Sequence, residues 1–150
     1  MRKLQDGPGQ GIYMITPCSF SVYDTTNWVL DTGSPIHICN SLQGLQVSRR
    51  FEDGERFLNM GNESRVPVLA LGVLKLVFES CTIILNECHF CPSFILNVIS
   101  VGQLVVYGYK LLIKNDIYKI ILNDSVILNG QMHDGIYVLS RPISVMYTSS

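Results

Sequence analysis

The sequence predicts an all-β domain with a barrel-like core and one short helix. From Ile12 onward the chain is dominated by short runs of aliphatic and β-branched residues. Pairs of Gly, Asn and Asp interrupt these runs, as in sheets built from tight hairpins. With 150 residues, 47% of them hydrophobic and 15% charged, the chain is long and apolar enough to form one folded core.

Short strands are expected along the whole chain after a flexible lead-in over residues 1–10. Each expected strand is an apolar run bounded by polar or turn-forming residues. The expected strands span 12–16, 27–30, 57–60, 66–71, 73–79, 82–87, 97–101, 110–114, 117–122, 125–128 and 135–140.

Four dipeptides are expected to form the tight turns, because Gly, Asn and Asp tolerate a positive φ. They are Gly61-Asn62, Asn115-Asp116, Asn123-Asp124 and Asn129-Gly130. The best candidate for a helix is 101–107, with Gly108 placed to end it. A second, weaker helix is expected over 42–51.

Charge and hydropathy exclude several partners. A formal net charge of −1 provides no basic field for phosphates, so we expect no direct contact with nucleic acid. Asp6-Gly7-Pro8-Gly9 stands where a signal peptide would be apolar. The longest apolar stretch, 66–74, is far below the ~20 residues that span a bilayer. We therefore expect a cytoplasmic protein without a membrane partner.

The cysteines form no recognisable metal site. Cys88-His89-Phe90-Cys91 is a C-x-x-C pair, but a structural zinc site needs four ligands, usually from two such pairs. A redox pair would need a helix after it, and none is expected there. We expect buried, reduced thiols, with Cys88 and Cys91 on opposite or unrelated faces of an extended segment. No metal and no other cofactor is expected; a zinc or redox role is the weaker alternative.

An apolar run ends in Asp31-Thr32-Gly33, the signature loop of aspartic proteases. A carboxylate can act as a general base on water when it shares a proton with a second carboxylate nearby. A hydroxyl residue after the Asp can hydrogen-bond to a partner loop, and a Gly allows close backbone approach. The same tripeptide also fits an ordinary strand that ends in a turn.

A second segment matches the same class of enzyme. Residues 96–104 resemble the strand-plus-helix element late in retropepsins, and Asn97-Val98-Ile99-Ser100 would then lie beside the catalytic loop. More widely, residues 28–139 resemble the protease region of copia-type retrotransposon Pol polyproteins. The matching pieces are 28–33, His37-Ile38-Cys39, Met60-Gly61-Asn62, Leu71-Gly72, Asn86-Glu87-Cys88 with Pro92, 97–104, Gly108-Tyr109 and 134–139.

The resemblance implies a retropepsin-like closed β-barrel that forms a C2 homodimer and cleaves its own Gag-Pol polyprotein, within the cell or within virus-like particles. Asp31 would be catalytic, Thr32 would contact the partner loop and Gly33 would shape the turn. The hairpin at Gly61-Asn62-Glu63 would be the flap that covers a peptide substrate.

The expected organisation has three parts. Residues 1–26 are a lead-in, 27–123 are the retropepsin-like barrel, and 124–150 are a C-terminal hairpin that resembles the start of the pre-integrase segment. Only one Asp-Thr-Gly is present, so the second carboxylate must come from an identical chain. The alternative is a catalytically inactive β-barrel remnant, either inert or a dimerisation and binding module. Pro35 and Glu63 favour this alternative, whereas the intact Asp31 loop favours the enzyme.

Overall fold

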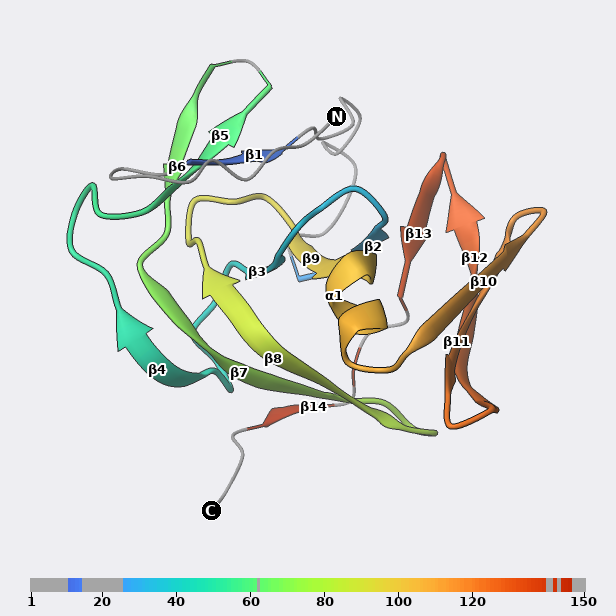
Figure 1. The fold of residues 1–150 in the computed structure, drawn as a ribbon. Helices are drawn as coiled ribbons and strands as arrows, with labels where there is room; N and C mark the ends of the chain where they lie inside the picture. The colour runs from blue at the N-terminus through green and yellow to red at the C-terminus, as the bar shows by residue number, and fades with distance from the viewer. Residues whose placement is uncertain (1–10, 15–25, 62, 140–141, 143, 147–150) are drawn as a thin grey trace.

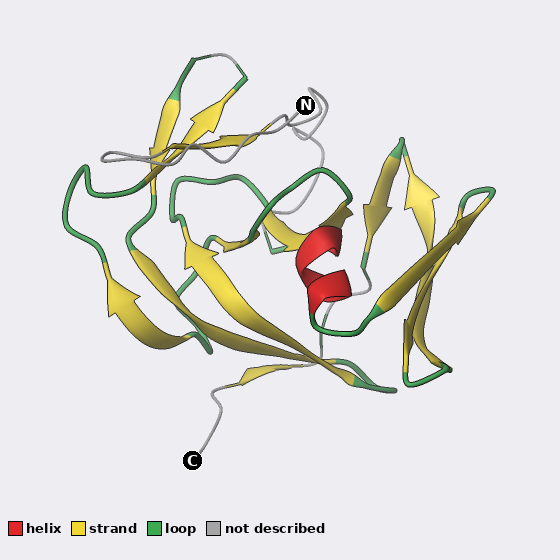
Figure 2. Cartoon of the chain, viewed as in Figure 1, coloured by secondary structure: helices red, strands yellow, loops and turns green. Residues whose placement is uncertain are grey.

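The structure is a computed structural model that describes residues 11–14, 26–61, 63–139, 142 and 144–146. The described residues are mostly strand, with one six-residue helix, α1 (Val101–Val106), beside the central strands (Figure 2). The strands are β1 (Gly11–Met14), β2 (Trp28–Asp31), β3 (His37–Cys39), β4 (Gln46–Arg50), β5 (Phe57–Met60), β6 (Arg65–Pro67), β7 (Ala70–Val77), β8 (Thr82–Phe90), β9 (Asn97–Ser100), β10 (Lys110–Lys114), β11 (Ile117–Leu122), β12 (Ser125–His133), β13 (Ile136–Val138) and β14 (Ser144–Met146). The predicted all-β class with one short helix is confirmed.

The strands form one large and one small sheet (Figure 1). The large sheet has the order β10-β11-β12-β13-β2-β9-β3-β8-β7-β14, and β4 also pairs with β7. The small sheet has the order β1-β5-β6. Among the described strands the pairing has two ends, β10 and β14, and does not close into a ring.

The helix α1 is too short to cross a membrane.

The centre of the large sheet is the parallel pair of β2 and β9. Trp28 is opposite Asn97 and Asp31 is opposite Ser100, so the two strands run side by side over their full length. All four residues of β9 and the first three of β2 are buried. A buried strand that delivers Asp31 into a loop beside residues 97–100 is therefore confirmed.

Two apolar clusters cover the two faces of this central pair. Successive side chains of a strand point to opposite faces, and Leu30 and Ile99 belong to one cluster while Val29 and Val98 belong to the other. The first cluster also contains Cys88 and the second contains Cys91. The prediction that these two thiols occupy different faces is confirmed.

Two predictions of local structure were wrong because distant strands decide the outcome. The helix expected over 42–51 is instead strand β4, which pairs antiparallel with β7 while Leu45 is buried in the first cluster. The expected strands 66–71 and 73–79 are divided differently, since β7 continues through Gly72. The backbone of β4 passes so close there that a Cβ on Gly72 would collide with the Gln46 carbonyl.

The turn predictions were mostly correct. Asn115, Asn123 and Asp124 adopt positive φ values of 58°, 52° and 63° at the ends of β10 and β11. The turn predicted at Asn129-Gly130 was wrong, because both residues lie inside β12. The tight turn that follows β12 is instead at Asp134 and Gly135, with φ values of 52° and 81°.

Gly130 is needed in β12 for packing and not for a turn. A Cβ at this position would lie 2.5 Å from the hydroxyl oxygen of Tyr118. Tyr118 is fully buried, and its hydroxyl donates to the Val138 carbonyl at 3.1 Å. The glycine therefore leaves room for the Tyr118 side chain, which ties β11 to β13.

Gly130→Ala should destabilise the protein by about 1–3 kcal/mol, because the added methyl group displaces a buried ring. Gly102→Ala is the matched control: the nearest atom to its Cβ is the Ser100 hydroxyl, at 3.7 Å. The control should be neutral or slightly stabilising, since Ala favours helix over Gly. Urea denaturation of both variants measures the difference, and equal stabilities would contradict this account of Gly130.

Candidate active site

The Asp31 loop begins where β2 ends. Asp31 is half-buried, and its Oδ1 accepts a hydrogen bond of 2.8 Å from the Gly33 amide. This two-residue contact is an Asx-type turn, which fixes the direction of the carboxylate. Thr32 at the tip of the turn is exposed. The loop thus presents a carboxylate and an adjacent hydroxyl at the end of a rigid strand.

Ser34 directs the second half of the loop into β3. Its side chain is buried, and its hydroxyl donates to the Ile36 carbonyl at 2.7 Å. Ile36 is buried in the second apolar cluster, and β3 starts at the next residue. The loop is therefore anchored by an apolar side chain as well as by hydrogen bonds.

Ser100 joins this loop to the end of β9. Its hydroxyl donates to the Ser34 carbonyl at 2.6 Å and accepts from the Gln103 amide at 3.1 Å, which caps helix α1. Its amide donates to Nδ1 of His37 at 2.9 Å. Gln103 adds a bond of 3.3 Å from its side-chain amide to the Pro35 carbonyl. The junction of β9 and α1 therefore holds the whole segment from Ser34 to His37.

His37 is a neutral hydrogen-bond acceptor in this network. Its side chain is almost wholly buried in β3, and burial, assisted by nearby His89, lowers its pKa from 6.5 to about 3. Because Nδ1 accepts from Ser100, the ring proton is on Nε2. Burial, with a contribution from Arg56, also lowers the pKa of His89 to about 4, although a hydrogen bond to the His37 backbone opposes this shift.

The predicted flap segment is a hairpin. Gly61 and Glu63 lie in the turn between β5 and β6, and Asn62 lies outside the described residues. The Glu63 amide donates to the Met60 carbonyl at 3.1 Å. Leu58 is buried in the second cluster, which also contains Ile36 from the Asp31 loop. The hairpin and the loop thus share one apolar support, and the flap role itself stays a prediction.

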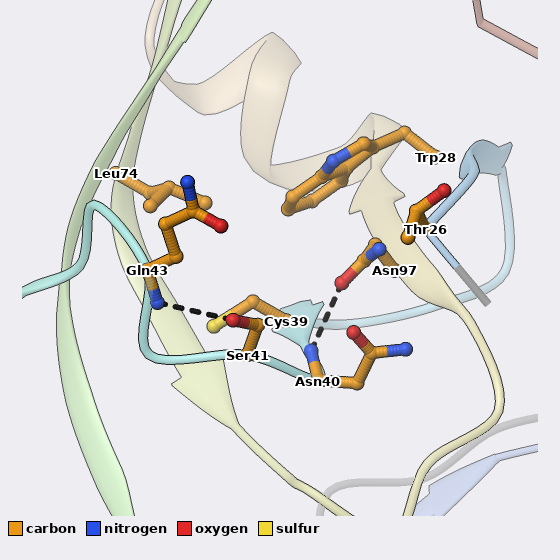
Figure 3. A pocket seen from close by; sticks show the side chains of 8 residues that line it. All are labelled: Thr26, Trp28, Cys39, Asn40, Ser41, Gln43, Leu74 and Asn97. Carbon is orange, nitrogen blue, oxygen red and sulfur yellow. Dashed lines mark hydrogen bonds between the residues drawn. The ribbon is translucent and has the colours of Figure 1, made fainter. Parts of the chain in front are cut away.

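A small cavity lies at the other end of the central strands. It has a volume of about 150 Å³, and Trp28 and Asn97, which begin β2 and β9, face it (Figure 3). Asp31 and Ser100 lie at the opposite ends of the same strands. The lining residues are Thr26, Trp28, Cys39, Asn40, Ser41, Gln43, Leu74 and Asn97. None carries a carboxylate, so we assign no proteolytic chemistry to this cavity.

Asn97 has a structural role at that end. Its Oδ1 accepts from the Asn40 amide at 2.9 Å, and its Nδ2 donates to the Asn27 carbonyl at 3.2 Å (Figure 3). Of the two bonds, Figure 3 draws the one between Asn40 and Asn97. Together the bonds tie the residues that flank β2 and β3 to the start of β9. In the predicted supporting strand, Asn97 and Ser100 therefore form hydrogen bonds at the two ends. Val98 and Ile99 pack in the apolar core between them.

The described cysteines are reduced thiols, and Cys39, Cys88 and Cys91 are buried. Burial raises the pKa of the Cys88 and Cys91 thiols well above their usual range. A buried thiol that stays protonated is a poor nucleophile and metal ligand. Within the described part of the chain, no three His, Cys, Asp or Glu side chains are grouped so that they could hold a metal ion.

Sequence reasoning missed His37 and Gln103 as supports of the loop. From the sequence, His37 was noted only as part of the His37-Ile38-Cys39 segment that resembles the family. Its signal was its position between Ile36 and Ile38, because a histidine inside an apolar strand is buried and needs a hydrogen-bond partner. Gln103 gave no signal, since its contact with Pro35 depends on how helix α1 packs.

These features define a β domain in which one Asp-Thr-Gly loop is held against a buried strand and the helix that follows it. The chain belongs to the family of the Pol polyprotein beta-barrel domain, whose model matches residues 28–109. This match includes both the Asp31 loop and Ser100. The resemblance to copia-type Pol polyproteins that the sequence indicated is thereby confirmed.

A similar protein is the retrovirus-related Pol polyprotein from transposon RE2 of Arabidopsis thaliana. It is 29% identical to this chain over 84 residues, which are 56% of this chain and 6% of that polyprotein. The chain therefore spans a small part of the length of this relative. No solved structure matches the chain.

The buried histidines predict a loss of stability in mild acid. Unfolding restores a pKa near 6.5, so between about pH 6.5 and pH 4 the unfolded chain binds protons that the native chain does not. Stability is complete above pH 6.5 and falls with decreasing pH, by about 1.4 kcal/mol per pH unit for each histidine. Urea denaturation at pH 7, 6 and 5 measures this slope.

His89→Asn supplies the control for this pH dependence. It removes one of the two buried imidazoles, so the slope between pH 6 and 5 should fall by about half. A free energy of unfolding that is the same at pH 7 and pH 5 in the native protein would show that these histidines are not buried in the neutral form.

Proposed function

We propose that this chain is an aspartic endopeptidase that processes the Gag-Pol polyprotein of its retrotransposon and acts as a homodimer. The observation that carries the proposal is the Asp31 loop. Its carboxylate is oriented by the Gly33 amide, and the following residues are held by Ser100 and Gln103. Such rigid placement is what a catalytic carboxylate needs, because misplacement by about 1 Å can cost 10²-fold in rate.

The chemistry follows from two Asp31 carboxylates that share one proton. The ionised carboxylate takes a proton from a water molecule, whose oxygen attacks the scissile carbonyl carbon. The protonated carboxylic acid donates its proton to the carbonyl oxygen, and a tetrahedral diol forms. When the diol collapses, the C–N bond breaks, one diol hydroxyl returns its proton to a carboxylate, and the leaving amine takes up a proton from the pair. The two carboxylates end with one proton, as they began.

The second carboxylate must come from a second copy of the chain. Asp124-Ser125 is followed by Val126, and no other Asp-Thr-Gly or Asp-Ser-Gly is present in the sequence. A two-fold axis beside the loop would bring identical Asp31 residues together. Thr32, exposed at the tip of the loop, is available to hydrogen-bond to the partner's loop across that axis.

The proposal also includes substrate cover and barrel closure. The hairpin at Gly61, Asn62 and Glu63 would fold over a bound peptide as a flap, and its base shares an apolar cluster with the loop. A barrel is supported by the description of the family, a beta-barrel domain, and its closure would require contact between β10 and β14, the two ends of the described pairing.

A catalytically inactive remnant that serves as a dimerisation or binding module is the second candidate. Glu63 is the observation in its favour. It occupies the flap turn with a φ of 67°, a conformation that costs a residue with a side chain about 1 kcal/mol or more and suits glycine better. A substituted flap tip would cover substrate differently from a glycine-rich one.

Asp31→Asn should reduce cleavage of the cognate Gag-Pol polyprotein by roughly a thousandfold or more, because the amide cannot act as a general base. The fold and the dimer should persist, since the change is nearly isosteric and removes the repulsion between two carboxylates. Asp53→Asn, at an exposed Asp-Gly elsewhere in the chain, is the matched control and should cleave normally. Cleavage by the Asp31→Asn protein would contradict the proposed mechanism.

Specific activity should also rise with protein concentration, because a monomer holds half of the active site. Sedimentation equilibrium over the same concentration range measures the dimer fraction. A monomer with full activity would exclude the shared site, and a stable dimer without activity that binds peptide would support the inactive binding module.

A further inference from the structure

We propose that His37 is a positioning residue for the candidate active site, and that it acts by holding the Ser100 amide through an imidazole acceptor. The inference rests on the proposed function of Asp31, because positioning has meaning only for a reacting group. Its structural part can nevertheless be tested without a substrate.

The hydrogen bond of His37 replaces a backbone contact between strands. β3 and β9 pair at Ile38 and Val98, and no further register pair joins these two strands. Ser100 lies two residues beyond Val98, fully buried, and its amide donates to Nδ1 of His37 at 2.9 Å. Without the imidazole, this buried N–H would have no acceptor from His37. A buried donor without an acceptor lowers the free energy of unfolding.

Ser100 also connects His37 to the Asp31 loop. Its hydroxyl donates to the Ser34 carbonyl at 2.6 Å, and Ser34 is three residues after Asp31. Asp31 itself is opposite Ser100 in the register of β2 and β9. A shift of Ser100 would therefore affect the loop at two points, at Asp31, which begins the Asp-Thr-Gly turn, and at Ser34, which follows it.

The surroundings of His37 keep the acceptor intact in mild acid. Burial lowers its pKa to about 3, and His89 on β8 opposes a positive charge on the ring. Arg56 acts in the same sense on His89, and Cys88, the register partner of His37, is a protonated thiol without charge. A dyad that shares one proton works in acidic solution, and His37 stays neutral through most of that range. Protonation would direct a second N–H at the Ser100 amide and break the bond.

Two substitutions of His37 separate positioning from packing. His37→Asn places an uncharged oxygen acceptor near the former position of Nδ1, whereas His37→Leu removes the acceptor and keeps a similar volume. Tyr118→Phe is the matched control, because it removes one hydrogen bond of a buried side chain in the β11–β13 region. Amide hydrogen exchange of Ser100, and kcat and KM on the Gag-Pol polyprotein, are measured for all four proteins.

His37→Leu should accelerate exchange of the Ser100 amide by about tenfold or more and lower kcat by a similar factor, with KM changed by less than about twofold. His37→Asn should retain most of both. Tyr118→Phe should change Ser100 exchange only as far as its global stability changes. Equal losses in His37→Asn and His37→Leu, or unchanged Ser100 exchange in His37→Leu, would overturn the inference.

A measurement on the native protein keeps the inference testable if His37→Leu does not fold. At pH 7, NMR should detect a scalar coupling across the hydrogen bond between the Ser100 amide and Nδ1 of His37. Absence of this coupling in the folded native protein would overturn the inference. If the native protein cleaves no polyprotein, the proposed function fails, while exchange and the coupling still decide whether His37 holds Ser100.

Discussion

Ser100 is the point at which the Asp31 loop, strand β3 and helix α1 are joined. Its amide donates to His37, and its hydroxyl both donates to the Ser34 carbonyl and accepts from the Gln103 amide. The residue is fully buried, so each of these groups depends on its protein partner, and loss of one costs about 1–3 kcal/mol. This dependence gives the loop one conformation, which is the condition for placing a carboxylate within reach of a second one.

The two apolar clusters make that network rigid. β2 and β9 are buried on both faces, because one cluster contacts Leu30 and Ile99 and the other contacts Val29 and Val98. Asp31 and Ser100 therefore lie at the end of a parallel pair that is packed on both faces. The hairpin of β5 and β6 packs on the second cluster, so the candidate flap and the loop are supported by the same core. The cavity at the start of β2 is separate from this arrangement.

Local patterns in the sequence were sufficient for the strands that are bounded by turn residues and for helix α1. The resemblance of the sequence to a known family placed residues 97–100 beside Asp31, and the register of β2 and β9 agrees with this placement. The failures have non-local causes. β4 forms because β7 offers it a partner, and Gly130 is a packing residue for Tyr118 although it looked like a turn. His37 could not be assigned from sequence because its partner Ser100 is 63 residues away.

In the proposed protease, two Asp31 loops meet at a two-fold axis and share a site for peptide cleavage. A crystal structure of the protein with a peptide inhibitor that carries a statine hydroxyl tests this shared site most directly. We expect a symmetric dimer in which the carboxylates of Asp31 and of its copy in the second chain both hydrogen-bond to that hydroxyl, with the β5–β6 hairpins over the peptide. An inhibitor bound elsewhere, or Asp31 facing solvent far from any second chain, would contradict it.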